Sequence, residues 1–235
     1  MFTGALCRSR FAPGVLLVSA LCAASSTAQT RPNFLGAQEP AKTTPGVRQK
    51  GSFSQFGPRE QWQMPVRVMD EIGVRPGMTV ADVGAGNGWF TFYLAERVGS
   101  SGRVIAEDID AKALEAVRQR YAQEKVSNVS VVVGETEDAK LPAGAVDLAL
   151  MVNVLSAVHN PTGLLVNLAK GLKPEGRLVI IDWDPGKLGQ LAEREENFAL
   201  RLTLRHIHDA DFEVVKILDF LPAQTIWICK RRVPD

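Results

Sequence analysis

The sequence is poor in cysteine and histidine and has no excess of positive charge. Its 235 residues include three cysteines and three histidines, and 27 lysines and arginines stand against 26 aspartates and glutamates. Cys7 and Cys22 lie in the first 28 residues, so beyond them Cys229 has no partner for an intramolecular disulfide. A nucleic-acid partner normally requires a larger basic surface, and we therefore expect none.

An apolar run long enough to cross a membrane is also missing. Arg8 and Arg10 precede a shorter apolar stretch, "FAPGVLLVSALCAASSTAQT", in which Ser26 and Ala28 form a small-residue cleavage pattern before Gln29. This arrangement is typical of a secretory signal peptide. We predict that residues 1–28 are removed and that the chain is exported to the periplasm or the extracellular space, with no stable membrane span after cleavage. An N-terminal anchor or a wrongly assigned start are the alternatives.

The stretch that follows has no apolar period. Residues 29–52 are rich in Pro, Thr, Gln and Gly, which predicts a disordered linker ahead of a domain at residues 53–235. The domain begins with helical spacing over residues 60–72, where Pro65 breaks or starts the main helix.

From residue 79 onward, strand-like and helix-like segments alternate. This order predicts an α/β fold with a parallel sheet covered on both faces. The last segment, residues 212–231, breaks the alternation and predicts two strands joined by a turn at residues 221–224, an antiparallel hairpin. The expected strands are 79–83, 103–108, 129–133, 146–152 and 177–182, and the expected helices are 88–98, 111–123 and 162–171.

The stretch "VADVGAGNGWF" joins the first expected strand to the first helix, where an open α/β sheet places its ligand. Its glycines let a backbone approach a ligand closely. A dinucleotide site requires G-x-G-x-x-G, but here the third glycine comes one residue early and Trp89 stands in its place; a phosphate loop would require Gly-Lys-Ser/Thr. Asp82 would repel a phosphate and suits an ammonium or sulfonium cation.

Acidic residues follow the second and third strands. Asp108 lies where a carboxylate could accept both hydroxyls of a ribose, whereas Asp110 is better suited to capping the next helix. In the turn "GETEDAKLP", Glu135 or Glu137 could meet an adenine amino group, with a solvated acidic loop as the alternative.

Taken in order, these elements resemble the class I S-adenosylmethionine-dependent methyltransferases over residues 74–231. The resemblance rests on "VADVGAGNG", on Asp108, on "AVDLALMVNVL", on "LKPEGRLVIIDW" and on the terminal hairpin. It implies a Rossmann-like, mostly parallel sheet of seven strands in the order 3-2-1-4-5-7-6, with strand 7 antiparallel, and S-adenosylmethionine as the cofactor. More narrowly, residues 56–99 resemble exported bacterial methyltransferases whose cores are similar to quinone-biosynthesis and arsenite methyltransferases.

The resemblance also implies a set of binding residues. Those expected to hold S-adenosylmethionine are Asp82, Gly84, Ala85, Gly86 and Gly88 at the methionine part, Asp108 and Ile109 at the ribose, Glu135 or Glu137 at the adenine, and Asn153 beside the transferred methyl. Arsenite methylation in this family uses several cysteines, whereas Cys229 alone remains here beyond residue 28. The segment "MVNVLSAVHN" stands where certain N-methyltransferases have an NPPY-type motif and cytosine C5 methyltransferases have a Pro-Cys nucleophile. The methyl acceptor is therefore expected to be a small molecule that the sequence does not identify.

His159 is the candidate general base, because it follows the fourth strand; the alternative is that it caps or precedes the helix near residue 161. His206 and His208 belong to a helix and are two residues apart, a spacing that does not place both on one face, so we expect no metal site.

Three further residues are candidates for contact with a substrate. Arg59 and Trp62 could form a lid that reaches a carboxylate, and Trp183 could line the acceptor site; simple packing is the alternative for both tryptophans. The resulting hypothesis is in-line methyl transfer to a small molecule. A non-catalytic protein that binds S-adenosylmethionine or another nucleoside is the alternative, and the G-x-G-x-G spacing disfavours a nicotinamide oxidoreductase.

Overall fold

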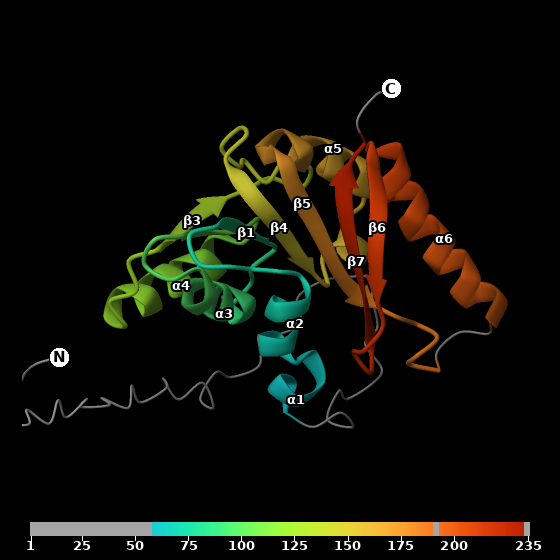
Figure 1. Cartoon of the computed structure of the whole chain (residues 1–235), viewed down its shortest axis with the longest axis horizontal. Helices are drawn as coiled ribbons and strands as arrows, with labels where there is room; N and C mark the ends of the chain where they lie inside the picture. The colour runs from blue at the N-terminus through green and yellow to red at the C-terminus, as the bar shows by residue number, and fades with distance from the viewer. Residues whose placement is uncertain (1–57, 190–192, 233–235) are drawn as a thin grey trace, which may run out of the picture. The chain divides into compact units, whose positions relative to one another are not determined.

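A computed structural model describes residues 58–189 and 193–232, with side chains in the last helix described from residue 200. These residues form one sheet of seven strands, in the order β3-β2-β1-β4-β5-β7-β6 (Figure 1). The strands are β1 (Thr79–Val83), β2 (Arg103–Asp108), β3 (Val129–Val133), β4 (Val146–Val152), β5 (Leu172–Trp183), β6 (Phe212–Leu218) and β7 (Gln224–Arg231).

The pairing of the strands confirms the predicted topology. Neighbours from β3 through β5 are parallel, whereas β7 runs antiparallel to both β5 and β6. The carboxyl ends of β1 to β6 therefore meet at one edge of the sheet, which points downward in Figure 1. We call it the carboxyl edge. In an open α/β sheet this edge is where ligands bind.

Helices cover both faces of the sheet. On one face α3 packs against β1 and β2, and α4 against β2 and β3; on the other face α5 and α6 pack against each other and over the sheet (Figure 1). The short helices α1 and α2 lie at the carboxyl edge. The helices are α1 (Arg59–Gln63), α2 (Pro65–Glu71), α3 (Trp89–Val98), α4 (Ala111–Gln123), η3 (Leu155–Ala157), α5 (Pro161–Gly171) and α6 (Glu193–Asp209).

The core is built from the central strands, whose apolar runs are buried on both sides as such runs predict. Leu148, Leu150, Val179 and Ile180 are fully buried. Cys229 on β7 is also buried, and burial raises the pKa of its thiol to about 12, so it behaves as a small apolar side chain.

The largest boundary difference from the prediction is at the start of β5, whereas several other element ends shift by one residue. β5 begins at Leu172 rather than residue 177, because Leu172 pairs with Val146 before the pairing resumes at Leu148 and Arg177. The segment "KPEG" is therefore an irregularity inside the strand and not a turn before it. In the N-terminal region, Pro65 starts α2, and Met64 ahead of it takes a left-handed conformation (φ 43°) that separates α1 from α2.

The predicted signal peptide and linker lie outside the described residues. Within residues 58–189 and 193–232, none of the helices has the length and hydropathy needed to cross a membrane.

Candidate functional site

The loop between β1 and α3 forms the centre of the carboxyl edge. Gly84 has a φ of +70°, and a Cβ placed on it would lie 2.3 Å from Cγ2 of Val154, so only glycine fits here. Gly86 also has a positive φ (+56°), but a Cβ on it would meet nothing within 4 Å. The loop thus packs tightly against the segment after β4 on one side and is open at Gly86, where a ligand can approach its backbone.

Asp108, the last residue of β2, shapes this loop. One carboxylate oxygen, Oδ2, accepts the N–H of Gly86 at 2.8 Å, and Oδ1 accepts the N–H of Asp110 at 2.9 Å. Each oxygen keeps a further lone pair for a ligand hydroxyl. Asp110 caps α4 by accepting the N–H groups of Lys112 and Ala113, which confirms the capping role expected for it.

Exposed apolar side chains lie next to Asp108. Ile109 is 61% exposed, and Val133, which pairs with Asp108 in the neighbouring strand, is 50% exposed. Two uncovered β-branched side chains beside a ribose-type carboxylate offer a flat apolar surface of the kind that a nucleobase covers.

Asp82 is more deeply placed than its expected role requires. It is 2% exposed, and its Oδ2 accepts the hydroxyl of Thr91 on α3 at 2.6 Å. Burial raises the pKa of this carboxyl to about 6, while the Thr91 hydrogen bond and the charge of Arg59 oppose the rise. Asp82 thus fixes α3 beneath the glycine loop, and direct contact with a cation stays a prediction.

Glu107 is a second buried carboxyl, and the sequence reasoning missed it. It lies on the opposite face of the sheet from Asp108, is 4% exposed, and its Oε2 accepts the N–H of Gly84 at 3.3 Å. Gly134 makes room for it, since a Cβ there would lie 1.8 Å from Oε1. Burial, with the nearby charge of Asp108, raises the pKa of Glu107 to about 8 against the effect of the Gly84 hydrogen bond. The sequence signal that could have identified Glu107 is the pair of adjacent acidic residues, Glu107 and Asp108, at the end of a buried strand.

The structure brings the candidate lid residues together at this edge. Trp62 stacks on Trp183, with ring centroids 5.5 Å apart and planes 25° from parallel. The guanidinium carbon of Arg59 lies 4.9 Å from the centroid of the Trp89 ring. Burial lowers the pKa of Arg59 to about 10, and the charge of Asp82 opposes this. Helix α1 therefore places a cation and an aromatic ring beside the glycine loop and the end of β5.

Hydrogen bonds extend from α1 across β7 to the end of β4. Arg59 donates to Gln63, Gln63 Nε2 donates to Gln224 Oε1 at 3.2 Å, and Gln224 Nε2 donates to Asn153 Oδ1 at 2.6 Å. We call these four residues the amide relay. Gln63 and Gln224 are fully buried. Asn153, the first residue after β4, has a φ of +58° and is partly exposed. Nothing in the sequence pattern indicated either glutamine.

The other acidic candidates already have partners within the protein. Glu135 pairs with Lys140 at 3.1 Å, and its side chain is 72% exposed. Glu137 accepts the amide of Asn160, the residue whose side chain caps α5. His159 precedes this cap and is exposed. Glu135 is thus the more accessible of the two glutamates.

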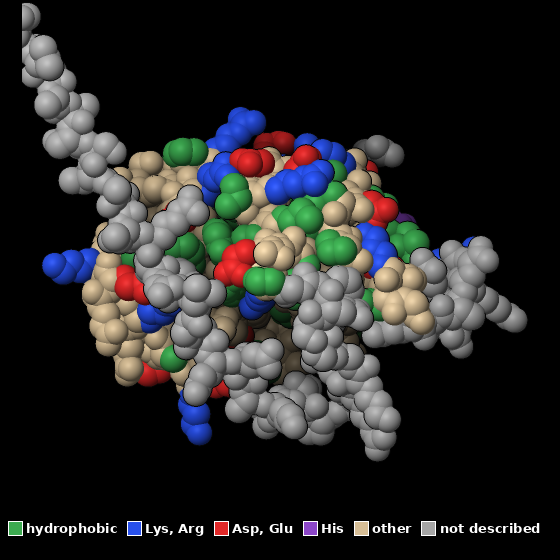
Figure 2. Space-filling view, turned by 90° about the horizontal axis from the view of Figure 1, so that it is seen from below, with side chains coloured by type: hydrophobic (Ala, Val, Ile, Leu, Met, Phe, Trp, Pro, Cys, Tyr) green, Lys and Arg blue, Asp and Glu red, His purple; other side chains and the backbone are tan. Residues whose placement is uncertain are grey.

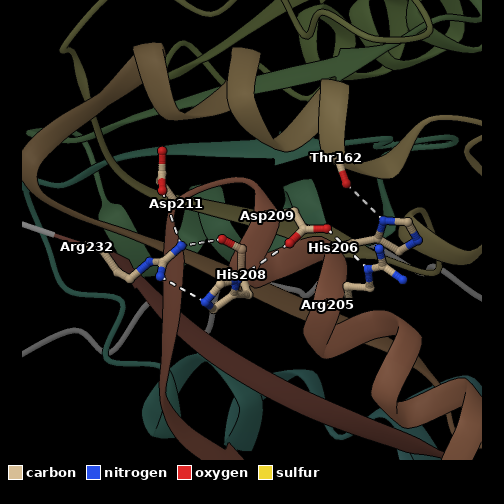
Figure 3. Close-up of polar contacts among 7 residues, drawn as sticks. All are labelled: Thr162, Arg205, His206, His208, Asp209, Asp211 and Arg232. Carbon is tan, nitrogen blue, oxygen red and sulfur yellow. Dashed lines mark hydrogen bonds and ion pairs between the residues drawn. The ribbon is translucent and has the colours of Figure 1, made fainter.

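The remaining histidines lie in the last part of α6. His206 hydrogen-bonds to Thr162 on α5 at 2.9 Å, whereas Nε2 of His208 faces Arg232 at 3.0 Å (Figure 3). The two rings have different partners, as their spacing predicts. In residues 58–189 and 193–232, no group of three or more His, Cys, Asp or Glu side chains is arranged to hold a metal ion.

Figure 2 views the molecule from the carboxyl edge and shows acidic, basic and hydrophobic side chains interspersed on the described surface. The strand order, the glycine loop after β1 and the acidic end of β2 define the class I S-adenosylmethionine-dependent methyltransferase fold. A family described as a methyltransferase domain matches residues 75–223, and the chain belongs to this family.

Similar proteins agree with this assignment. The chain is 32% identical to nocamycin O-methyltransferase of Saccharothrix syringae over 48% of its own length and 40% of that protein. It is 30% identical to the ubiquinone/menaquinone biosynthesis C-methyltransferase of Hydrogenovibrio crunogenus over 54% of its own length and 50% of that protein. The matches thus span about half or less of these curated relatives.

Among solved structures, a SAM-dependent methyltransferase from Aquifex aeolicus superposes with a TM-score of 0.65 at 25% identity, covering 75% of this chain and 95% of that one. A geranyl diphosphate C-methyltransferase from Streptomyces coelicolor, at 19% identity, shares the fold with a TM-score of 0.57 over 73% of this chain and 79% of that one.

Proposed function

We propose that this protein transfers a methyl group from S-adenosylmethionine to a small-molecule acceptor. The observation that carries the proposal is the open glycine loop bonded to Asp108, next to the exposed Ile109 and Val133, in a chain of the methyltransferase-domain family. A backbone open at Gly86, a carboxylate and an apolar surface suit the three parts of the donor: the amino acid, the ribose and the adenine.

The described residues divide these tasks. The glycine loop and Arg59 would receive the amino acid part, Asp108 the ribose hydroxyls, and Ile109 with the Glu135 loop the adenine. Similar proteins support S-adenosylmethionine as the donor. The Aquifex protein is named as SAM-dependent, and the geranyl diphosphate enzyme was solved with S-adenosyl-L-homocysteine.

When bound, the donor supplies a methyl carbon that an acceptor's electron pair displaces in line from sulfur, the carbon–sulfur pair staying on the sulfur. The protein's part is then to align the acceptor and exclude water. Asn153 at the end of β4 and the Trp62–Trp183 stack would position the acceptor. The buried hydrogen bond from Gln63 on α1 to Gln224 holds this helix over the edge. His159, exposed in the loop before α5, would serve as a base only for an acceptor that must lose a proton.

Two measurements test this proposal. Titration calorimetry with S-adenosylhomocysteine tests donor binding, and no binding at millimolar concentration would refute it. A radiolabelled-methyl assay against cell-envelope extract tests transfer; binding without donor-dependent labelling would instead favour the non-catalytic alternative. That alternative is motivated by the expected export signal, because the donor is made in the cytoplasm.

We also propose that residues 1–28 direct export. Mass spectrometry of the mature protein, with a first residue at Gln29, would support this, and an intact N-terminus in the cytoplasmic fraction would contradict it.

A further inference from the structure

The amide relay has a fixed direction because it begins at an arginine. A guanidinium has donors and no acceptor, so Gln63 must turn its oxygen toward Arg59 and its NH2 toward Gln224. Gln224 must in turn present its oxygen to Gln63 and its NH2 to Asn153. Reversing any amide would set like groups against each other and leave a buried polar group unpaired, at a cost of about 1–3 kcal/mol.

This direction decides which end of the Asn153 amide faces outward. Its Oδ1 is turned toward the buried Gln224, so the outward side of the amide presents the Nδ2 donor to a ligand. Across the described parts of the chain, no hydrogen bond is formed by Nδ2. Asn153 is also partly exposed, and it lies next to the glycine loop through Val154, which contacts Gly84.

We propose that Asn153 selects acceptors that present an oxygen atom at or beside the atom to be methylated, such as phenols and enols, over amines. An oxygen nucleophile has a second lone pair, so it can accept the Nδ2 hydrogen while another pair forms the bond to the methyl carbon. The carbon–sulfur pair stays on sulfur, and the hydroxyl proton leaves to His159 or to solvent. In an enol whose neighbouring carbon is the nucleophile, the hydroxyl oxygen accepts the Nδ2 hydrogen while the pair of the C=C bond attacks the methyl carbon. An arylamine nitrogen has one lone pair, which is conjugated with the ring and is needed for attack on the methyl carbon, so its N–H groups would face the Nδ2 donor of Asn153 even before transfer. The inference rests on the proposed function and adds the substrate class.

The test uses the full chain saturated with S-adenosylhomocysteine and pairs of compounds that differ only in OH or NH2: phenol and aniline, 1-naphthol and 1-naphthylamine, catechol and o-phenylenediamine. Ligand-observed NMR gives the affinity of each compound. We expect the hydroxyl members to bind the wild type at least about five-fold more tightly, the value of one hydrogen bond.

Asn153→Asp is the decisive variant. Aspartate tolerates a left-handed φ and can still accept from Gln224, so it replaces only the outward N–H by an oxygen. We expect the hydroxyl preference to disappear or reverse, and titration of S-adenosylhomocysteine into the same variant reports donor binding separately. Gln119→Glu, the same change of amide to carboxylate on the exposed side of α4, should keep the preference.

A second variant, Gln224→Met, removes the partner that orients Asn153, and we expect it to lower the preference. Equal binding of both members, a preference for amines, absence of binding by every pair, or a preference unchanged in Asn153→Asp would each overturn the inference. A parallel loss of S-adenosylhomocysteine affinity in Asn153→Asp would show that Asn153 meets the donor, which also overturns it. Failure of the wild type to bind S-adenosylhomocysteine would refute the proposed function instead.

Discussion

Replacing Glu107 with glutamine should make the protein less sensitive to alkaline pH. In the native state Glu107 is buried beneath the glycine loop and its pKa is raised from 4.5 to about 8. Between these two values the native state holds a proton that the unfolded chain has released. The stabilisation is therefore complete below pH 4.5 and is lost as the pH rises through 8.

The structure sets the size of the effect. A difference of one bound proton changes the free energy of unfolding by about 1.4 kcal/mol per pH unit, so Glu107 should lower the stability of the wild type by roughly 2 kcal/mol between pH 6 and pH 8. The Asp82 carboxyl, whose pKa is raised to about 6, is half protonated at pH 6 and contributes only about half a kcal/mol over this range.

Urea unfolding followed by tryptophan fluorescence at pH 6, 7 and 8 measures this directly. Glu107→Gln should remove the decline of about 2 kcal/mol while its side-chain oxygen still accepts from Gly84. Histidine titration is common to both proteins and cancels in the difference. Glu115→Gln, an exposed change on α4, should leave the wild-type slope intact. Equal slopes for the wild type and Glu107→Gln would show that the pKa of Glu107 is not raised in the native state.

Three further predictions concern the loop and its acidic neighbours. Gly84→Ala should lower the free energy of unfolding by more than about 2 kcal/mol, because the added methyl group meets Val154. Gly144→Ala, at a glycine that also has a positive φ but has open space around it, should cost only about 1 kcal/mol. Thermal unfolding compares the two variants, and equal losses would contradict a steric clash at Gly84. Asp108→Asn should weaken S-adenosylhomocysteine binding about ten-fold in calorimetry, since it loses the charged acceptor for ribose hydroxyls, and an unchanged affinity would remove Asp108 from the site. Glu135→Gln should weaken the same binding more than Glu137→Gln, whose partner Asn160 caps α5; the reverse order would assign the adenine to Glu137.

Much of the fold could be predicted because the strands alternate with amphipathic helices. The ranges of β1 to β4 and of α4 match the expected ones, since buried apolar runs bounded by turn residues leave little freedom. The start of β5 could not be predicted, because Pro and Gly in "LKPEG" normally mark a turn. Its pairing with β4 is a tertiary contact, which keeps Leu172 in the sheet.

The candidate site was predictable only where a residue type has a local signature. Glycines after a strand and an acidic strand end have one, and the structure places Gly86 and Asp108 in contact. A buried glutamine has none, so the partnership of Gln63 with Gln224 across 161 positions emerged only in three dimensions. Glu107 was not predicted, because Asp108 was assigned to the ligand site and strand alternation places adjacent residues on opposite faces.

Calorimetric titration of S-adenosylhomocysteine into the wild type and Asp108→Asn tests directly whether the carboxyl edge binds the donor. We expect saturable binding of one molecule per wild-type chain, with a dissociation constant on the order of micromolar, and a clear loss of affinity in the variant. Absence of binding to the wild type at millimolar concentration would contradict the assignment of the carboxyl edge as a donor site.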